Sequence, residues 1–219
     1  VNLNNASGLK MTVESVVSQS STRFEYIVID GGSMDGSVDV IKQYQDKITY
    51  WISEPDKGIY NAMNKGIKVA KGEYCQFVNS GDRLIKPDVI EKLLAQMPPC
   101  SFFYGNMIKT LHGGKIYRDR CESGRISLFT FIIGSLNHTP VLIKRNLFDK
   151  YGFYDETLKI VSDWKFYLIA IGINNEPVRY TDMDVAFFDM NGISNSEKEM
   201  VAKERDQVLK SLLPFQVLQ

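Results

Sequence analysis

The sequence predicts an α/β fold with a mostly parallel central sheet and helices on both of its faces. Strand-like and helix-like patterns alternate through residues 1–100, which is typical of strand–helix–strand units. Each predicted strand of that region ends in a polar turn that carries a carboxylate or an amide. The chain has 219 residues, of which 44% are hydrophobic, a size and a content that suit one domain with a substantial core.

The first half of the chain predicts a series of strands that are each followed by a helix. Apolar and β-branched runs indicate the strands, and apolar residues spaced three or four apart indicate the helices. The predicted strands are 1–5, which is only the tail of a strand, 24–30, 48–52 and 74–78. The predicted helices are 9–17, with Ser7 as a candidate N-cap, 38–44, 59–70, and one that starts at Pro87 and is stopped by Pro98 and Pro99.

The second half is less regular. We expect strands at 102–107, 141–143 and 179–190, helices at 145–151, 163–171 and 194–213, and a hairpin around His112-Gly113-Gly114. Residues 127–133 are apolar and fit either a helix or a strand. In the helix 163–171 the side chains of Trp164, Leu168 and Ile171 should face inward. No linker, repeat or low-complexity tract interrupts the chain, so we expect a single domain over 1–219.

The polar turns that end the first-half strands should form one acidic crevice. They carry Asn4-Asn5, Asp30, Glu54 with Asp56, and Asp82. Parallel strands place such turns at one edge of a sheet, where open α/β sheets bind ligands. Carboxylates repel phosphate unless a divalent cation lies between them, and Asp82 with a nucleotide diphosphate would make a hard-oxygen site for Mn²⁺ or Mg²⁺. The Gly31-Gly32-x-x-x-Gly36 stretch lacks the dinucleotide spacing and no Walker lysine follows it, so the crevice suits a nucleotide-sugar.

The composition disfavours several other classes of protein. The 26 basic and 26 acidic side chains leave a formal net charge of zero, which provides no footprint for nucleic acid. The cysteines Cys75, Cys100 and Cys121 form no C-x-x-C pair, so a disulfide framework and a structural zinc are disfavoured and a reducing, cytoplasmic compartment is expected. No apolar run approaches the ~20 residues of a membrane span. The sequence begins without a methionine and without a signal-peptide pattern.

Five stretches in order along nearly the whole chain carry a resemblance to a known family. They are residues 12–19, 26–37 and 53–66, the segment Phe77-Val78-Asn79-Ser80-Gly81-Asp82, and a set formed by residues 137–140, 152–156 and 162–164. Together they resemble family 2 glycosyltransferases of the GT-A fold, in the branch of colanic-acid and exopolysaccharide biosynthesis. The resemblance implies a Rossmann-like nucleotide-diphospho-sugar transferase fold, with a nucleotide-sugar-binding half at 1–100 and an acceptor-binding half at 101–219.

The resemblance also implies roles for individual residues. Asp163 matches the carboxylate taken as the catalytic base, and Asp82 matches the metal ligand of the D-x-D region, which would hold Mn²⁺ or Mg²⁺. The donor, a nucleotide-diphospho-sugar, would be bound by Asn4, Asp30, Gly32, Ser33, Asp56, Lys57 and Asn79. His138 and Trp164 would lie on the side of the acceptor, a glycan or a lipid-linked saccharide. The expected reaction is a single displacement at the anomeric carbon with inversion, in which the base removes the acceptor's hydroxyl proton and the metal offsets charge on the departing diphosphate.

The chain departs from the family pattern at two places. The segment Asn79-Ser80-Gly81-Asp82 keeps one carboxylate of the D-x-D, so metal affinity should depend on the phosphates of the donor. The full central strand that precedes Asn4 in the family is almost absent, and we expect that this first strand is truncated in the sequence.

Other interpretations stay open. A glycosyltransferase-like module that binds a nucleotide-sugar or a glycan without catalysis also fits the reduced D-x-D, whereas a nucleotidyltransferase is weaker because residues 4–8 contain no Lys or Arg. Asp30 could be an ordinary turn aspartate, and Asp82 and Asp163 could cap backbone N–H groups. The charged C-terminal helix is most simply a solvated face. Its apolar residues could instead pack on a second copy of the chain or on the inner face of a membrane, where a lipid-linked acceptor would be used.

Overall fold

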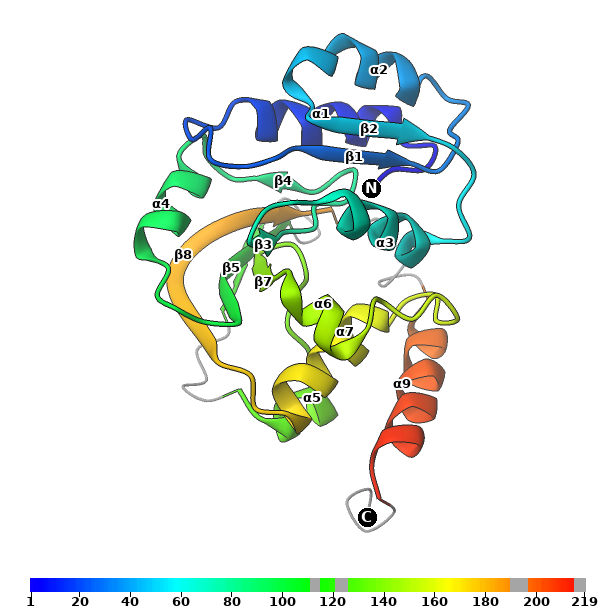
Figure 1. Cartoon of the computed structure of the whole chain (residues 1–219), viewed down its shortest axis with the longest axis vertical. Helices are drawn as coiled ribbons and strands as arrows, with labels where there is room; N and C mark the ends of the chain where they lie inside the picture. Colours follow the sequence, from blue (N-terminus) through cyan, green and yellow to red (C-terminus); the bar gives the residue numbers. More distant parts are fainter. Residues whose placement is uncertain (111–114, 121–125, 190–196, 215–219) are drawn as a thin grey trace.

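The computed structural model describes residues 1–110, 115–120, 126–189 and 197–214 (Figure 1). Its helices are α1 (Ala6–Val17), α2 (Ser37–Gln43), α3 (Ile59–Val69), α4 (Val89–Gln96), α5 (Leu128–Ile133), α6 (Asn146–Tyr151), α7 (Ser162–Tyr167) and α9 (Lys198–Leu212). A 3-10 turn (Gln45–Lys47) follows α2, and a π-helical segment (Leu168–Ile173) continues α7. Its strands are β1 (Ile27–Asp30), β2 (Tyr50–Ser53), β3 (Tyr74–Cys75), β4 (Arg83–Leu84), β5 (Phe102–Thr110), β6 (Ile116–Asp119), β7 (Val141–Lys144) and β8 (Val178–Phe188).

The first-half strands β1 and β2 pair in parallel and have helices on both faces, as predicted (Figure 1). Leu9 of α1 and Ile41 of α2 pack with Val28 in one buried cluster on one face. On the other face α3 lies close to β1, with Gly66 beside Ile29. The α/β class is therefore confirmed in this half.

Residues Val1 and Asn2 continue the parallel arrangement beyond β1. The Asn2 N–H donates to the Ile29 carbonyl at 3.0 Å, and the Asn2 carbonyl accepts from the Gly31 N–H at 2.9 Å. On the far side, the Ser80 N–H donates to the Val1 carbonyl at 3.0 Å. The polar turns that follow β1, β2, Asn2 and residue 78 therefore lie at the same edge of this parallel arrangement, as the sequence predicts.

A cavity of about 380 Å³ separates β1 from the extended residues 74–78. Its walls are mostly apolar and include Ile29, Met63 and Leu93. The cavity keeps residues 74–78 from pairing with β1. Of the strand predicted at 74–78 only β3 is formed, and it pairs with β7.

The larger, six-stranded sheet differs from the predicted mostly parallel sheet. Its order is β3-β7-β5-β8-β4, with β6 paired to β5. Only the β5–β8 pairing in it is parallel, and the β3–β7, β7–β5, β8–β4 and β5–β6 pairings are antiparallel. The expectation of a mostly parallel sheet is wrong here because strands of the second half insert between β3 and β4, which the alternation in residues 1–100 does not reveal.

Helices cover both faces of this sheet as well. Phe103 of β5 faces α4, where it packs with Leu93, whereas Phe102 faces α7 and its π-helical continuation. An aromatic cluster fills the second interface, with the Phe148 and Phe166 rings stacked at 4.6 Å. Trp164, Leu168 and Ile171 are each at most 2% exposed, which confirms that this helix face points inward.

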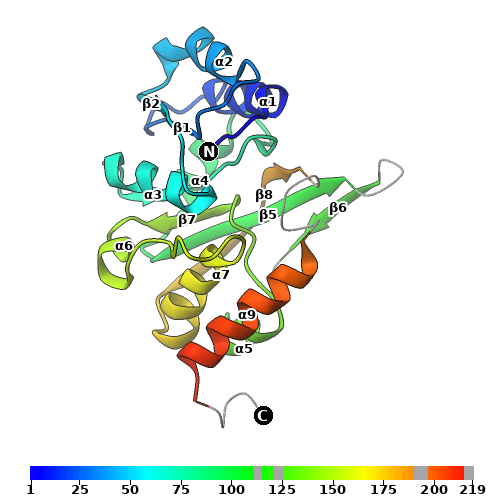
Figure 2. The same cartoon turned by 90° about the vertical axis from the view of Figure 1, so that its right-hand side faces the viewer.

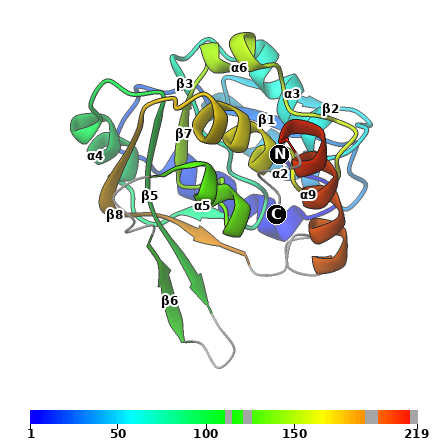
Figure 3. The same ribbon diagram turned by 90° about the horizontal axis from the view of Figure 1, so that it is seen from below.

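The remaining elements follow the sequence expectation closely. The ambiguous segment 127–133 contains helix α5, which begins after its N-cap Ser127, and β8 is a long strand that curves around the molecule (Figure 1). Strands β5 and β6 form the predicted hairpin, which projects from the body of the protein (Figure 3). Its predicted turn, His112-Gly113-Gly114, lies outside the described residues. The C-terminal helix α9 begins at Lys198, and the predicted start at residues 194–196 also lies outside them.

The surroundings of Gly105 on β5 and of Gly66 on α3 predict opposite effects for two glycine-to-alanine substitutions. A Cβ at Gly105 would lie 2.5 Å from the Met183 carbonyl oxygen, so Gly105→Ala should lower the free energy of unfolding by roughly 1–3 kcal/mol. A Cβ at Gly66, inside α3, would meet only Ile29 at 3.6 Å, so Gly66→Ala should raise it by about 0.5–1 kcal/mol. Urea unfolding of both variants beside the unmodified chain measures the two changes. Equal stability of Gly105→Ala and the unmodified chain would contradict this packing of β5 on β8.

Candidate active site

The turn after β1 is organised by the carboxylate of Asp30. This side chain is fully buried. Its oxygens accept hydrogen bonds from the Asn2 side-chain amide at 2.6 Å, the Ser33 N–H at 2.9 Å, the Ser33 hydroxyl at 2.6 Å and the Ser53 hydroxyl at 2.6 Å. Burial raises the pKa of Asp30, but the hydrogen bonds from these partners lower it more, so the net shift is downward. Asp30 therefore acts as a buried anion that bonds its own loop, and contact with a nucleotide stays a prediction.

The other predicted nucleotide-sugar residues of this edge lie around that loop. The Ser33 hydroxyl accepts the Asn4 N–H at 2.7 Å, and the Asn4 side chain accepts the Met34 N–H at 2.9 Å. A Cβ on Gly32, which has φ of +81°, would come within 3.1 Å of the Pro55 nitrogen, so the loops after β1 and β2 touch there. Asp56 lies against Gly31 in the same contact, whereas Lys57 is exposed.

A second cluster brings the predicted metal residue and the predicted base together. The His138 imidazole lies between them, with Nε2 3.6 Å from Asp82 Oδ2 and Nδ1 3.9 Å from Asp163 Oδ2. Asp82 comes from the polar segment after β3, and Asp163 from the first turn of α7. The two halves of the chain therefore meet at His138.

Asp82 is held by partners from distant segments rather than by its own turn. One carboxylate oxygen accepts the Thr139 hydroxyl at 2.7 Å, and the other accepts the Asp189 N–H at 2.9 Å. The side chain is 4% exposed. These bonds are not those of a helix cap, so the capping interpretation of Asp82 is not supported.

The environment of His138 favours the protonated imidazole. Burial lowers the pKa of His138, but Asp82 and Asp163 raise it, and the net shift is upward. The Asn79 side chain contacts His138 Nε2 at 2.9 Å, and the Asn79 amide oxygen is buried without a partner. Rotating that amide by 180° would let its oxygen accept the Nε2–H of a protonated His138. Asn79 thus joins the predicted donor side to this cluster.

Asp163 is oriented by Tyr60 and makes no cap of its own helix. The Tyr60 hydroxyl lies 2.9 Å from Asp163 Oδ1, and the Asp163 side chain is 18% exposed. No side-chain hydrogen bond caps α7, whose N-cap position is Val161. Burial and the charge of Asp163 raise the pKa of Tyr60 well above its ordinary value, so its hydroxyl stays a donor. The same hydroxyl lies 2.5 Å from the Ile160 carbonyl oxygen, and the second carboxylate oxygen of Asp163, Oδ2, faces His138 Nδ1 at 3.9 Å.

Trp164 lies beneath the site rather than on its surface. Its ring is 2% exposed, and its indole N–H donates to the Phe131 carbonyl at 3.0 Å and the Gly134 carbonyl at 3.1 Å. In this structure Trp164 fixes α7 against α5, and contact with an acceptor stays a prediction.

Sequence reasoning missed Asp189 and Glu204. Asp189 directly follows β8, and its carboxylate lies beside Gly81, where an added Cβ would be 2.6 Å from Asp189 Oδ2. The rule that acids end strands could have identified it. Glu204 of α9 is buried and accepts the N–H groups of residues 159–161, at 2.7 to 3.2 Å, just before α7. No local pattern in a charged helix distinguishes such a residue.

The donor set at this cluster suits a divalent cation only in part. Within the described ranges, no three Asp, Glu, His or Cys side chains converge on a point that would hold an ion. Asp82 and Asp189 are neighbours in the structure, since the Asp189 N–H donates to Asp82 Oδ1, and carboxylate oxygens are ligands that Mg²⁺ and Mn²⁺ prefer. The remaining ligands would have to come from a bound diphosphate.

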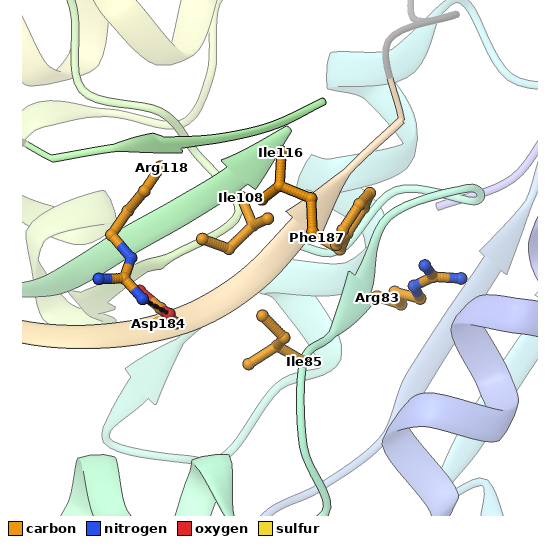
Figure 4. Close-up of a pocket in the computed structure, with 7 residues that line it drawn as sticks. All are labelled: Arg83, Ile85, Ile108, Ile116, Arg118, Asp184 and Phe187. Carbon is orange, nitrogen blue, oxygen red and sulfur yellow. Dashed lines mark hydrogen bonds and ion pairs between the residues drawn. The ribbon is translucent and has the colours of Figure 1, made fainter. Parts of the chain in front are cut away.

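Another surface cavity lies on the opposite face of the same sheet. Its volume is about 620 Å³, and its lining residues are Arg83, Ile85, Ile108, Ile116, Arg118, Asp184 and Phe187 (Figure 4). Side chains alternate along β8, so Phe187 lines this cavity while its neighbour Phe188 contacts His138 with ring centroids 6.4 Å apart. The cavity is therefore distinct from the candidate active site.

The comparisons with known proteins agree on one family. The family model described as glycosyl transferase family 2 matches residues 1–151. An uncharacterized glycosyltransferase of Mycobacterium tuberculosis is 34% identical over 201 residues, covering 89% of this chain and 75% of that protein. A PGL/p-HBAD biosynthesis glycosyltransferase of Mycobacterium bovis is 26% identical over 214 residues, covering 92% and 80%.

Solved structures share the fold at lower sequence identity. S. aureus TarS 1-349 in complex with UDP has a TM-score of 0.70 at 17% identity, covering 95% of this chain and 67% of that one. The mannosyltransferase PcManGT from Pyrobaculum calidifontis, in complex with GDP-Man and Mn²⁺, has a TM-score of 0.67 at 12% identity, covering 96% and 61%. At these identities the likeness concerns the fold alone.

The raised pKa of His138 predicts a specific pH dependence of stability. Folded His138 holds its proton at pH values where an unfolded imidazole, with a pKa of about 6.5, has lost it. The resulting stabilisation is full below that pH and is lost as pH rises through the folded pKa. The free energy of unfolding should therefore fall with pH above about 6.5, and His138→Asn should reduce this slope. Urea unfolding across that range measures it, and NMR titration compares His138 with His112, the other of the two histidines. A His138 midpoint at or below the ordinary value would contradict the assignment.

Proposed function

The chain belongs to glycosyltransferase family 2 and has the GT-A fold, and on this basis we propose that it transfers a sugar from a nucleotide-diphospho-sugar to a glycan or lipid-linked acceptor with inversion at the anomeric carbon. One observation carries the proposal. His138 lies between Asp82 and Asp163, so the predicted diphosphate side and the predicted base meet at a single point.

A nucleotide-diphospho-sugar donor is supported by the fold neighbours and by the crevice. TarS has been crystallised with UDP and with UDP-GlcNAc, and PcManGT with GDP-Man. In this chain the loops after β1 and β2 form a rigid, hydrogen-bonded edge around Asp30 and Ser33. The base and ribose would lie against this edge, and the diphosphate would extend towards Asp82.

Asp163 is the proposed general base. The Tyr60 hydroxyl lies beside Oδ1, and Oδ2, which is 3.9 Å from His138 Nδ1, would accept the proton of an acceptor hydroxyl. As that hydroxyl oxygen attacks the anomeric carbon, Asp163 takes its proton while the bond from the carbon to the diphosphate oxygen breaks on the opposite side. The acceptor gains the sugar, and the nucleotide diphosphate leaves with the bonding electrons. A protonated His138 would place positive charge beside Asp82, where the negative charge of the leaving group grows.

A divalent cation, Mn²⁺ or Mg²⁺, is proposed as the cofactor. Asp82 and Asp189 are the residues that would hold it, together with phosphate oxygens of the donor. When bound, such a cation offsets the charge of the departing diphosphate.

The place of action is also a proposal. Cys75 and Cys100 are free thiols, which supports a reducing, cytoplasmic compartment. Among the described residues no helix is long and apolar enough to cross a membrane. A lipid-linked acceptor in polysaccharide biosynthesis would bring the protein to a membrane surface as a peripheral contact.

A module that binds a nucleotide-sugar or a glycan without catalysis is the second candidate. It is favoured by the reduced D-x-D, in which only Asp82 of the segment 79–82 is a carboxylate. Donor binding without turnover, whatever acceptor is offered, would distinguish it from a transferase.

Replacing Asp163 by Asn tests the base. Transfer should fall by roughly 10²–10⁴-fold, because the amide cannot accept the proton, while binding of the nucleotide-sugar should be unchanged. Asp149→Asn is the matched control, since Asp149 is an exposed aspartate in the first turn of the neighbouring helix α6. Initial rates and donor titrations of both variants give the comparison, and full activity in Asp163→Asn would rule out the assignment.

Thermal melting with UDP or GDP tests the cation. A nucleotide at about 100 times its dissociation constant should stabilise the chain by roughly 2.7 kcal/mol, and Mn²⁺ should be required for most of that effect. A chelator should remove it, and Asp82→Asn should abolish the Mn²⁺-dependent part. Asp46→Asn is the control, because Asp46 is an exposed aspartate in the 3-10 turn that follows α2. This variant should behave like the unmodified protein. A full shift in the presence of chelator would overturn the metal proposal.

A further inference from the structure

The helix α9 is fixed firmly against the loop that leads to Asp163. It runs beside α7 (Figure 2). The buried carboxylate of Glu204 accepts the N–H of Lys159 at 2.7 Å, of Ile160 at 3.0 Å and of Val161 at 3.2 Å. Val208, one turn further, is 3% exposed and belongs to the main core. The residue next to Glu204 is therefore held in a defined place near the candidate base.

That residue is Arg205, whose guanidinium lies over the ring of Trp164. Its guanidinium carbon lies 5.0 Å from the centroid of the Trp164 ring, a cation–π contact. In the part of the chain that the structure describes, no ion pair or hydrogen bond is made by Arg205, and its Nε is buried without a partner. Burial lowers the pKa of Arg205, and the charge of Asp163 acts in the opposite direction. A desolvated cation thus lies close to the candidate base.

A buried N–H donor without a hydrogen-bond partner, such as Arg205 Nε, destabilises the folded protein. A ligand that accepts its hydrogen bond removes that destabilisation. The planar guanidinium matches the oxygen atoms of a phosphate or a carboxylate better than any other side chain. The contact with Trp164 holds the guanidinium near the ring, and its buried Nε lacks a hydrogen-bond partner among the described residues. The chemistry of the missing partner is therefore that of an oxyanion.

The position of Arg205 indicates which substrate carries the oxyanion. The loops predicted to bind the nucleotide come from the first half of the chain, and the proposed diphosphate site is at Asp82. Arg205 lies instead with Trp164 and Asp163, on the side from which an acceptor hydroxyl must approach. We propose that Arg205 binds a phosphate or carboxylate group of the acceptor, and that the acceptor is consequently an anionic saccharide. This inference rests on the proposed function, which it deepens by naming the acceptor class.

The test uses binding, so that it does not depend on turnover. The chain has two tryptophans, Trp51 and Trp164, and in a Trp51→Phe background the emission reports on the ring beneath Arg205. The probes are N-acetylglucosamine 1-phosphate and neutral N-acetylglucosamine. The sugar phosphate should change the emission in a saturable way, and the neutral sugar should bind roughly tenfold or more weakly, because it lacks the charge-assisted hydrogen bonds.

Variants on α9 assign the effect to Arg205. Arg205→Met should weaken sugar-phosphate binding by about tenfold or more, and Arg205→Lys should restore only part of it, because an ammonium lacks the planar fork. Lys203→Met is the matched control, since Lys203 is an exposed cation of the same helix, and it should leave binding unchanged. Thermal melting of each variant without ligand shows whether the fold is retained.

Two results would overturn the proposal. Equal binding of the sugar phosphate by Arg205→Met and the unmodified chain would show that Arg205 holds no oxyanion. A loss of UDP and GDP affinity in Arg205→Met, with sugar-phosphate binding unchanged, would assign Arg205 to the donor instead. Failure of the proposed function would look different, because it would remove transfer in the unmodified chain while these binding differences remained measurable.

Discussion

The imidazole of His138 lies between two carboxylates from opposite halves of the chain, and the candidate active site depends on this arrangement. Its nitrogens are 3.6 Å from Asp82 and 3.9 Å from Asp163. Two like charges brought so close in a largely buried place would repel each other, whereas a cation between them reverses the sign of the interaction. The attraction between the imidazolium and these two carboxylates is also the cause of the upward pKa shift of His138. A protonated His138 therefore reduces the repulsion between Asp82 and Asp163.

Buried carboxylates fix the frame on both sides of His138. Asp30 accepts hydrogen bonds from Asn2, Ser33 and Ser53, which joins three segments, and Glu204 accepts three N–H groups of the loop before α7. Burying an anion is costly unless its oxygens are fully hydrogen-bonded, so each carboxylate restricts its loop to one geometry. Such restricted loops suit a reaction in which a hydroxyl, an anomeric carbon and a leaving oxygen must be aligned.

The parts of the fold that depend on local sequence could be predicted, and those that depend on distant contacts could not. Alternation of apolar runs gave the helices α1 to α4, the strands β1 and β2, and the shared edge of their polar turns. The insertion of β5, β7 and β8 between β3 and β4 was not predicted, because the period of side chains along one strand does not indicate its neighbours in the sheet. Asp82 and Asp163 were identified through motifs, whereas Glu204 and Arg205 lie in a helix whose charges look uniformly solvated. Only the tertiary contacts with residues 159–161 and Trp164 separate those two from their neighbours.

In the reduced D-x-D segment, an acidic residue from a distant part of the chain lies beside the single remaining carboxylate. In the segment 79–82 Asp82 is the one acidic residue, and its neighbour Gly81 has φ of +107°, a conformation that suits glycine. The absence of a side chain at Gly81 leaves room for Asp189, whose carboxylate would collide with an added Cβ. A second carboxylate therefore reaches the site from the end of β8, more than a hundred residues further along the chain. The motif alone therefore does not reveal every acidic residue beside Asp82, because Asp189 comes from the end of β8.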